Sequence, residues 1–302
     1  MTKKEKLLGD LFREAIYTAK TGPELLELFS QKISKNFYSD DFLILQLASQ
    51  LYESAQIRKA IATYMQMQAL VSNECYNLIS SKYTNLNFCS SQRVKSIISE
   101  IYKRCERIFD EGRSPEIRDL VASKIIILAD ENQETLSYEY KIVSETMKHF
   151  SYLNSQKDFP LSVNLAGPDK LVTKSNFSHE KHPNIVLPEE KIIIPGLSVL
   201  GKDYISHPKT HGYQAFHCSY ELISKSNSMN RIFSEIQVTT ISQANYEPAN
   251  HDKYKKKRND KWDEIFEFDE NKVHIAGYYP QFGKDYSGLQ EPLYVTEEPK
   301  TF

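Results

Sequence analysis

Two acidic residues stand in predicted buried strands, and a loop crowded with cationic and aromatic side chains precedes a third strand. Asp119 lies near the start of the apolar run "RDLVASKIIIL", and Glu235 lies on the polar face of "RIFSEIQVTT". The loop 201–217 carries lysines, histidines and tyrosines. Because an isolated buried carboxylate is costly, one such residue alone is more often a salt-bridge partner or a cap than a catalytic group.

Together with the cationic loop, the two carboxylates predict a magnesium site. Mg²⁺ prefers carboxylate oxygens, substrate phosphates and retained waters, so the surrounding cations would hold a polyphosphate. Tyr213 follows Gly212 in a predicted turn, where a ring either packs against the protein or stacks on a nucleobase, worth roughly 1–3 kcal/mol. Arg93, Lys95 and Lys103 suit phosphate contacts at the start of a helix.

The composition excludes several classes of protein. With 38 Lys+Arg against 40 Asp+Glu in 302 residues, bulk charge does not indicate nucleic-acid or membrane binding. No apolar run approaches the roughly 20 residues that span a bilayer. The P-loop pattern is absent, which excludes that class of nucleotide-binding enzyme. The four cysteines have no C-x-x-C spacing and predict reduced thiols of a cytoplasmic protein.

Periodicity divides the chain into three parts. Residues 1–88 predict a helical N-terminal extension, because apolar residues recur at three and four spacing. A helix with an apolar stripe from Ile97 to Ile108 follows, and Gly112 is a natural stop. Alternating apolar and polar residues predict two strands at 216–222 and 231–240, which pair with each other in antiparallel orientation. The remaining predictions are a crossover helix, a loop-dominated insertion at about 154–198 with a short strand at 191–196, and a tail at 263–302 with an edge strand at 272–279.

Five segments, in order, resemble the RelA/SpoT-type alarmone synthetases, especially the small single-domain ones. The segment "GKDYISHPKTHGYQAFHCSY" is similar to their signature loop, and "SEIQVTT" to their E-I-Q-I-R-T strand. The other three are "SQRVKSIISEIYKR", "IRDLVASKIII" and "ANYEPANHDKYK". The resemblance spans about 91–257 and places a synthetase domain at 89–262.

This resemblance implies an α+β fold, with a nucleotidyltransferase-like mixed β-sheet flanked by helices beside the N-terminal helical extension. It also implies Mg²⁺-dependent transfer of pyrophosphate from ATP to the 3′-hydroxyl of GTP or GDP, which yields (p)ppGpp and AMP. Such a protein would be cytoplasmic, and a homo-oligomer is compatible with it. The mechanism requires in-line positioning and charge neutralisation more than covalent help from the protein.

The resemblance also implies a role for each matching residue. Asp119 and Glu235 would bind the metal and be catalytic, with Glu235 orienting or deprotonating the attacking hydroxyl. The ATP side would be formed by Arg93, Lys95, Ser99 and Lys103. The acceptor pocket would be formed by Lys202, Lys209, His211, Tyr213, His217, Gln237 and His251, with Tyr213 stacked on the base.

Four positions depart from the family pattern, and they leave the acceptor open. His211 and Lys124 stand where the family has Asn and Arg, and Thr239 and Asn245 replace an Arg and a Glu. A second hypothesis is therefore a toxin-like relative that modifies an adenine nucleotide or the 3′ end of tRNA, with an antitoxin-like protein as a partner; the basic run at 253–258 also motivates it. A third is a nucleotide-binding protein without turnover.

Overall fold

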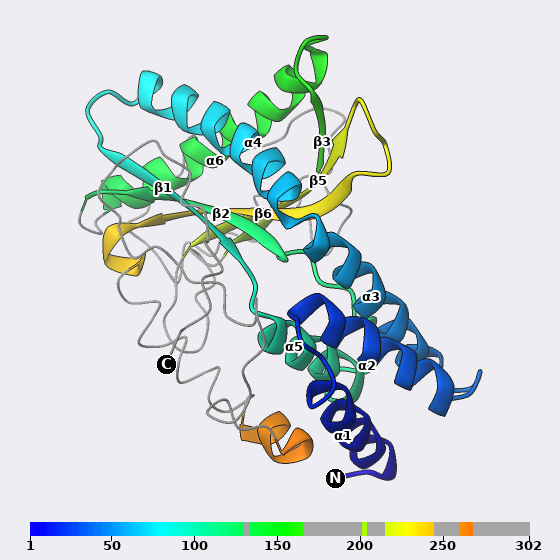
Figure 1. Ribbon diagram of the computed structural model, residues 1–302. Helices are drawn as coiled ribbons and strands as arrows, with labels where there is room; N and C mark the ends of the chain where they lie inside the picture. The colour runs from blue at the N-terminus through cyan, green and yellow to red at the C-terminus, as the bar shows by residue number, and fades with distance from the viewer. Residues whose placement is uncertain (130–132, 166–200, 204–214, 245–259, 268–302) are drawn as a thin grey trace.

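The computed structural model describes residues 1–129, 133–165, 201–203, 215–244 and 260–267 (Figure 1). The strands expected at 191–196 and 272–279 lie outside these ranges. So do Lys209, His211, Tyr213 and His251 of the predicted acceptor pocket.

Strands from distant parts of the chain form one mixed sheet. Its order is β1–β2–β6–β5–β3, and the short β4 also pairs with β5. The β2–β6 pair is parallel, whereas the other pairs are antiparallel. This sheet with helices around it confirms the predicted fold class. The strands are β1 (Phe88–Val94), β2 (Val121–Ile127), β3 (Leu161–Leu165), β4 (Gly201–Asp203), β5 (Phe216–Ser224) and β6 (Arg231–Thr240).

The helices begin at residues that cap them well. Thr2 forms a capping box with Glu5, and the side chains of Thr21 and Ser96 each accept a hydrogen bond from a backbone N–H in the first turn. None of the helices in the described ranges has the length and apolar character needed to cross a bilayer. They are α1 (Lys3–Ile16), α2 (Gly22–Asn36), α3 (Phe42–Lys59), α4 (Ile61–Lys82), α5 (Ile97–Phe109) and α6 (Gln133–Ser155).

The predicted alternation gives the β5–β6 pair one apolar and one polar face. The helices α4 and α6 lie side by side over the apolar face and share its core (Figure 1). That core includes Ile236 and Val238 of β6, whereas Glu235 and Gln237, which alternate with them, point to the opposite face. The period of two therefore decides which side chains of β6 are available for chemistry.

One buried polar cluster ties α4 to three strands inside the apolar core. The Gln68 side chain is fully buried and donates to Ser123 Oγ at 2.7 Å and to Tyr220 Oη at 2.6 Å. Its Oε1 atom accepts from Ser234 Oγ at 2.6 Å. Since unsatisfied buried polar groups are costly, this cluster favours one alignment of β2, β5 and β6 over others.

A second core lies beside the sheet and joins the two ends of the described chain. It unites α1, α2, α3 and α5 with a short helix at 260–266. Phe12 stacks on Phe266 with ring centroids 4.4 Å apart. Gly9 is required there, because a Cβ atom at this position would meet the Ile265 carbonyl oxygen at 2.2 Å. The four N-terminal helices thus divide between two cores, since α4 belongs to the core of the sheet.

A buried charge cluster connects α3, α5 and the segment that leads into β2. The fully buried Glu100 pairs with Arg58 Nη2 at 2.7 Å and with Arg104 Nη2 at 2.8 Å. Arg104 Nη1 also donates to the Pro115 carbonyl oxygen at 2.9 Å. Burial raises the pKa of Glu100, but the charges of Arg104 and Arg58 outweigh it and hold this pKa below its ordinary value of 4.5.

We predict that Glu100→Gln lowers the free energy of unfolding at pH 7 by about 3–5 kcal/mol, because it breaks a buried ion pair and leaves arginines uncompensated. A carboxyl whose folded-state pKa is depressed stabilises the fold above its unfolded pKa, and this stabilisation is lost as pH falls. The difference between the variant and the wild type should therefore shrink below about pH 4.5. Urea unfolding from pH 7 to pH 3.5 measures it; a constant difference over that range would contradict the assignment.

Candidate active site

The two predicted carboxylates line the same pocket on the polar side of the sheet. Asp119 comes two residues before β2, and Glu235 on β6 is in register with Ala122 of the parallel β2. The parallel pairing places both near the same end of the two strands. The pocket has a volume of about 240 Å³. It is lined by Lys103, Arg107, Arg113, Ser114, Glu116, Arg118, Asp119, Ser219 and Glu235.

Asp119 is buried among cationic side chains. Its Oδ2 atom lies 2.8 Å from Lys95 Nζ and 3.8 Å from Arg93 Nη2, and its Oδ1 atom lies 2.9 Å from Lys103 Nζ. Burial alone would raise the pKa of this carboxyl, but Lys103, Lys95 and Arg93 hold it well below 3.8. Asp119 is therefore a carboxylate at neutral pH.

Of the two lysines beside Asp119, Lys95 is buried and Lys103 is 26% exposed. Burial lowers the pKa of Lys95 to about 7, although Asp119 opposes this shift. Burial also lowers the pKa of Lys103, again against the attraction of Asp119. Bound phosphate would favour the charged form of both amines, because an adjacent negative charge stabilises an ammonium ion.

Glu235 has one polar partner on its own strand and one on the neighbouring β5. Its Oε1 atom lies 3.2 Å from His217 Nδ1 on β5 and accepts a hydrogen bond of 2.7 Å from Gln237 Nε2. Burial raises the pKa of Glu235 and so does nearby Asp119, but the interaction with His217 outweighs both and leaves the pKa far below 4.5. Two mutually repelling carboxylates are thus ionised at one pocket, which is an arrangement that a divalent cation relieves.

Three arginines of the pocket, Arg107, Arg113 and Arg118, were not predicted from the sequence, and the first two of them lie close together. The turn after α5 brings these two together: Gly112 adopts a φ of +61°, and the Arg113 N–H donates to the Arg107 carbonyl oxygen at 2.9 Å. The Arg107 Nε atom is buried and has no hydrogen-bond partner within the described part of the chain. The helical spacing of Lys103 and Arg107, four residues apart, was the signal available in the sequence.

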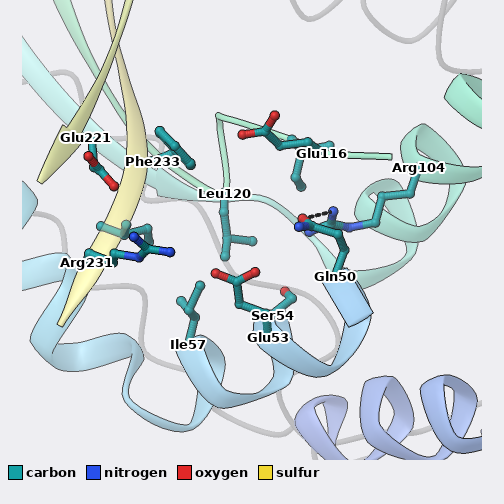
Figure 2. Close-up of a pocket in the computed structure, with 12 residues that line it drawn as sticks. Gln50, Glu53, Ser54, Ile57, Arg104, Glu116, Leu120, Glu221, Arg231 and Phe233 are labelled. Atoms are coloured by element: carbon teal, nitrogen blue, oxygen red, sulfur yellow. Dashed lines mark hydrogen bonds between the residues drawn. The ribbon is translucent and has the colours of Figure 1, made fainter. Parts of the chain in front are cut away.

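The segment that carries Asp119 packs against α3 and α5 on the side away from the active-site pocket. Figure 2 shows the hydrogen bond between Arg104 and Gln50 beside the segment with Glu116 and Leu120. A small pocket of about 60 Å³ lies here, between α3 and the starts of β2 and β6. On the side of the active-site pocket, Arg118 pairs with Glu116 at 3.6 Å and lies over the Phe233 ring at 5.7 Å.

The structure brings together most of the predicted site residues that it describes. Arg93, Lys95 and Lys103 surround Asp119, and His217 and Gln237 contact Glu235. Arg93 lies on β1, a strand that was not predicted from the sequence, rather than at the start of α5. Ser99 lies in the first turn of α5 but does not line the pocket. Lys202 is in register with His217 in the β4–β5 pair.

The donor set fits the expected magnesium ion. Asp119 and Glu235 supply ionised carboxylates at one pocket, and Mg²⁺ commonly binds one or two carboxylates plus substrate phosphates. Gln237 Oε1, beside Glu235, is buried and has no hydrogen-bond partner in the described ranges. No cluster of three or more His, Cys, Asp or Glu exists there either, so phosphate oxygens and water would complete the coordination.

Comparisons with known proteins give matches among solved structures. No family model and no curated protein matches this chain. Small alarmone synthetase 2 from Bacillus subtilis is 20% identical with a TM-score of 0.38, over 70% of this chain and 89% of that one. Small alarmone synthetase 1 from Bacillus subtilis, bound to its product pppGpp, is 16% identical with a TM-score of 0.35, over 69% and 90%. A GTP pyrophosphokinase family protein from Streptococcus pneumoniae is 16% identical with a TM-score of 0.34, over 72% and 90%. Each of these solved proteins is one to which this chain is similar over about 70% of its length.

Proposed function

We propose that this protein transfers pyrophosphate from ATP to the 3′-hydroxyl of GTP or GDP, with Mg²⁺ as the metal. The observation that carries the proposal is the meeting of two ionised carboxylates, Asp119 and Glu235, in one pocket walled by cations. Pyrophosphate transfer needs such a pocket, because the donor brings several negative charges and a metal that bridges them.

Each group in the pocket has a task in this reaction. Asp119 and Glu235 would hold Mg²⁺, which when bound neutralises phosphate charge and orients the phosphate chain. Lys95, Lys103 and Arg107 would bind the phosphates of ATP, since charge-assisted hydrogen bonds to phosphate are strong. The acceptor oxygen would then form a bond to the β-phosphorus and release its hydroxyl proton to solvent water, the bond between that phosphorus and the α,β-bridging oxygen would break, and AMP would leave.

Glu235 suits orientation of the acceptor hydroxyl better than storage of its proton. Its pKa lies far below neutral, whereas an efficient general base has a pKa near the working pH. His217 and Gln237 contact this carboxylate and would fix it next to the acceptor. The predicted acceptor residues Lys202, Lys209, His211, Tyr213 and His251 would complete this side.

The two other hypotheses lack a supporting observation in the described part of the chain. The basic run at 253–258, which motivates a tRNA acceptor, lies outside that part. The departures at Thr239 and Lys124 motivate a protein without turnover, but both carboxylates still line the pocket. Lys124 is in register with Gln237.

We predict that Asp119→Asn and Glu235→Gln each reduce turnover by about 10²–10⁴-fold, because each removes a metal-binding carboxylate. The assay incubates the pure protein with labelled ATP, Mg²⁺ and GTP, GDP, ATP or deacylated tRNA, and resolves the labelled product. Asp158→Asn, an exposed carboxylate between α6 and β3, is the matched control and should retain full activity. Absence of labelled product with every acceptor would contradict the proposed function.

We predict that Arg107→Gln raises the KM for ATP by about 10-fold or more and changes the KM for the acceptor little. The physical reason is the loss of a charged hydrogen bond to phosphate, worth about 1.5–3 kcal/mol. Arg231→Gln, at the exposed start of β6 and outside the active-site pocket, is the control. An unchanged KM for ATP in Arg107→Gln would show that this arginine does not bind the donor.

A further inference from the structure

Lys95 is held through both of its flanking peptide groups, the one shared with Val94 and the one shared with Ser96. Its N–H donates to the Leu120 carbonyl oxygen at 2.8 Å, and its carbonyl oxygen accepts a hydrogen bond of 2.6 Å from Arg58 Nη2. Lys95 stands between the end of β1 and Ser96, the N-cap of α5. The orientation of these two peptide groups therefore sets the direction in which the Lys95 side chain leaves the backbone.

Arg58 reaches the Lys95 carbonyl oxygen from α3, a helix that lies outside the sheet (Figure 1). Its side chain is 5% exposed. The same guanidinium donates to Glu100 Oε2 from Nη2 at 2.7 Å and from Nε at 3.2 Å. A planar fork can hold a carboxylate and a carbonyl oxygen in fixed directions at once, which the single ammonium of a lysine does less well.

With its backbone fixed in this way, Lys95 has its Nζ atom 2.8 Å from Asp119 Oδ2. Asp119 directly precedes Leu120, whose carbonyl oxygen receives the Lys95 N–H. The backbone and side chain of Lys95 thus bridge β1 to the segment that carries the carboxylate. A displacement of about 1 Å at such a site can cost as much as 10²-fold in rate.

We propose that Arg58 is a positioning residue that orients Lys95 toward Asp119 and the donor phosphates. The inference rests on the proposed function for the identity of the ligand. The geometry assigns Arg58 a role distinct from that of Glu100, because Arg58 contacts the Lys95 carbonyl oxygen directly, whereas Glu100 reaches that peptide through Arg58.

The experiment compares Arg58→Lys and Arg58→Gln with Glu100→Gln in the full chain. Both Arg58 variants should bind tripolyphosphate with Mg²⁺ about 10-fold more weakly in calorimetry, as is typical when a supporting group of a site is removed. The amide hydrogen of Lys95 should exchange about 10-fold faster in both, because the adjoining peptide group, which carries the Lys95 carbonyl oxygen, loses its anchor and the backbone at Lys95 opens more readily. Glu100→Gln should unfold at a lower temperature yet bind tripolyphosphate nearly as the wild type does. Lys59→Gln, the exposed neighbour of Arg58 on α3, should change neither property.

The outcomes separate this proposal from the proposed function. Arg58 variants with wild-type binding and wild-type exchange of the Lys95 amide would overturn it. So would weakened binding in all three variants in proportion to their loss of melting temperature, because that result shows a purely structural role. Failure of the wild type to bind tripolyphosphate would contradict the proposed function. Exchange of the Lys95 amide would still decide whether Arg58 holds the backbone at Lys95.

Discussion

The buried charge of Asp119 is the constraint on which the site depends. A carboxylate at this depth is costly unless it is compensated, and Lys95 and Lys103 compensate it through both of its oxygens. Lys95 is buried in turn, whereas the Lys103 side chain is 26% exposed, so loss of Asp119 would leave the charge of Lys95 in a poorly solvated place. Asp119 could exchange one of these lysine ammonium partners for a metal ion, and the released lysine could then bind a phosphate.

The rest of the fold positions the other residues of the pocket around Asp119. The parallel pairing of β2 with β6 brings Glu235 to the pocket, and the alternation of β6 turns it away from the apolar core. The Gln68 cluster ties α4 to three strands on that apolar face. On the other side, Arg58 and Arg104 link the N-terminal helices to the segments that carry Lys95 and Asp119. The structure thus supports the pocket from two separate cores.

The sequence predicted the elements whose pattern is local. The alternation at 216–222 and 231–240 predicted β5, β6 and their antiparallel pairing, and the buried run after Asp119 predicted β2. The strand β1 was not predicted, because "FCSSQRV" has little alternation and is a strand through its pairing with β2. Arg58 and Glu100 meet across 42 residues, and such a contact follows from tertiary packing that no local pattern encodes. Arg113 reaches the pocket through the turn at Gly112, whose geometry the sequence predicted only as a helix end.

The central claim is that Asp119 and Glu235 share one divalent ion. Crystals of the protein grown with a non-hydrolysable ATP analogue and Mn²⁺ test it most directly, because the anomalous signal of manganese locates the ion independently of the protein atoms. The account predicts one ion in the pocket, bound to an oxygen of each carboxylate and to phosphate oxygens. An ion that binds elsewhere, with neither Asp119 nor Glu235 among its ligands, would contradict it.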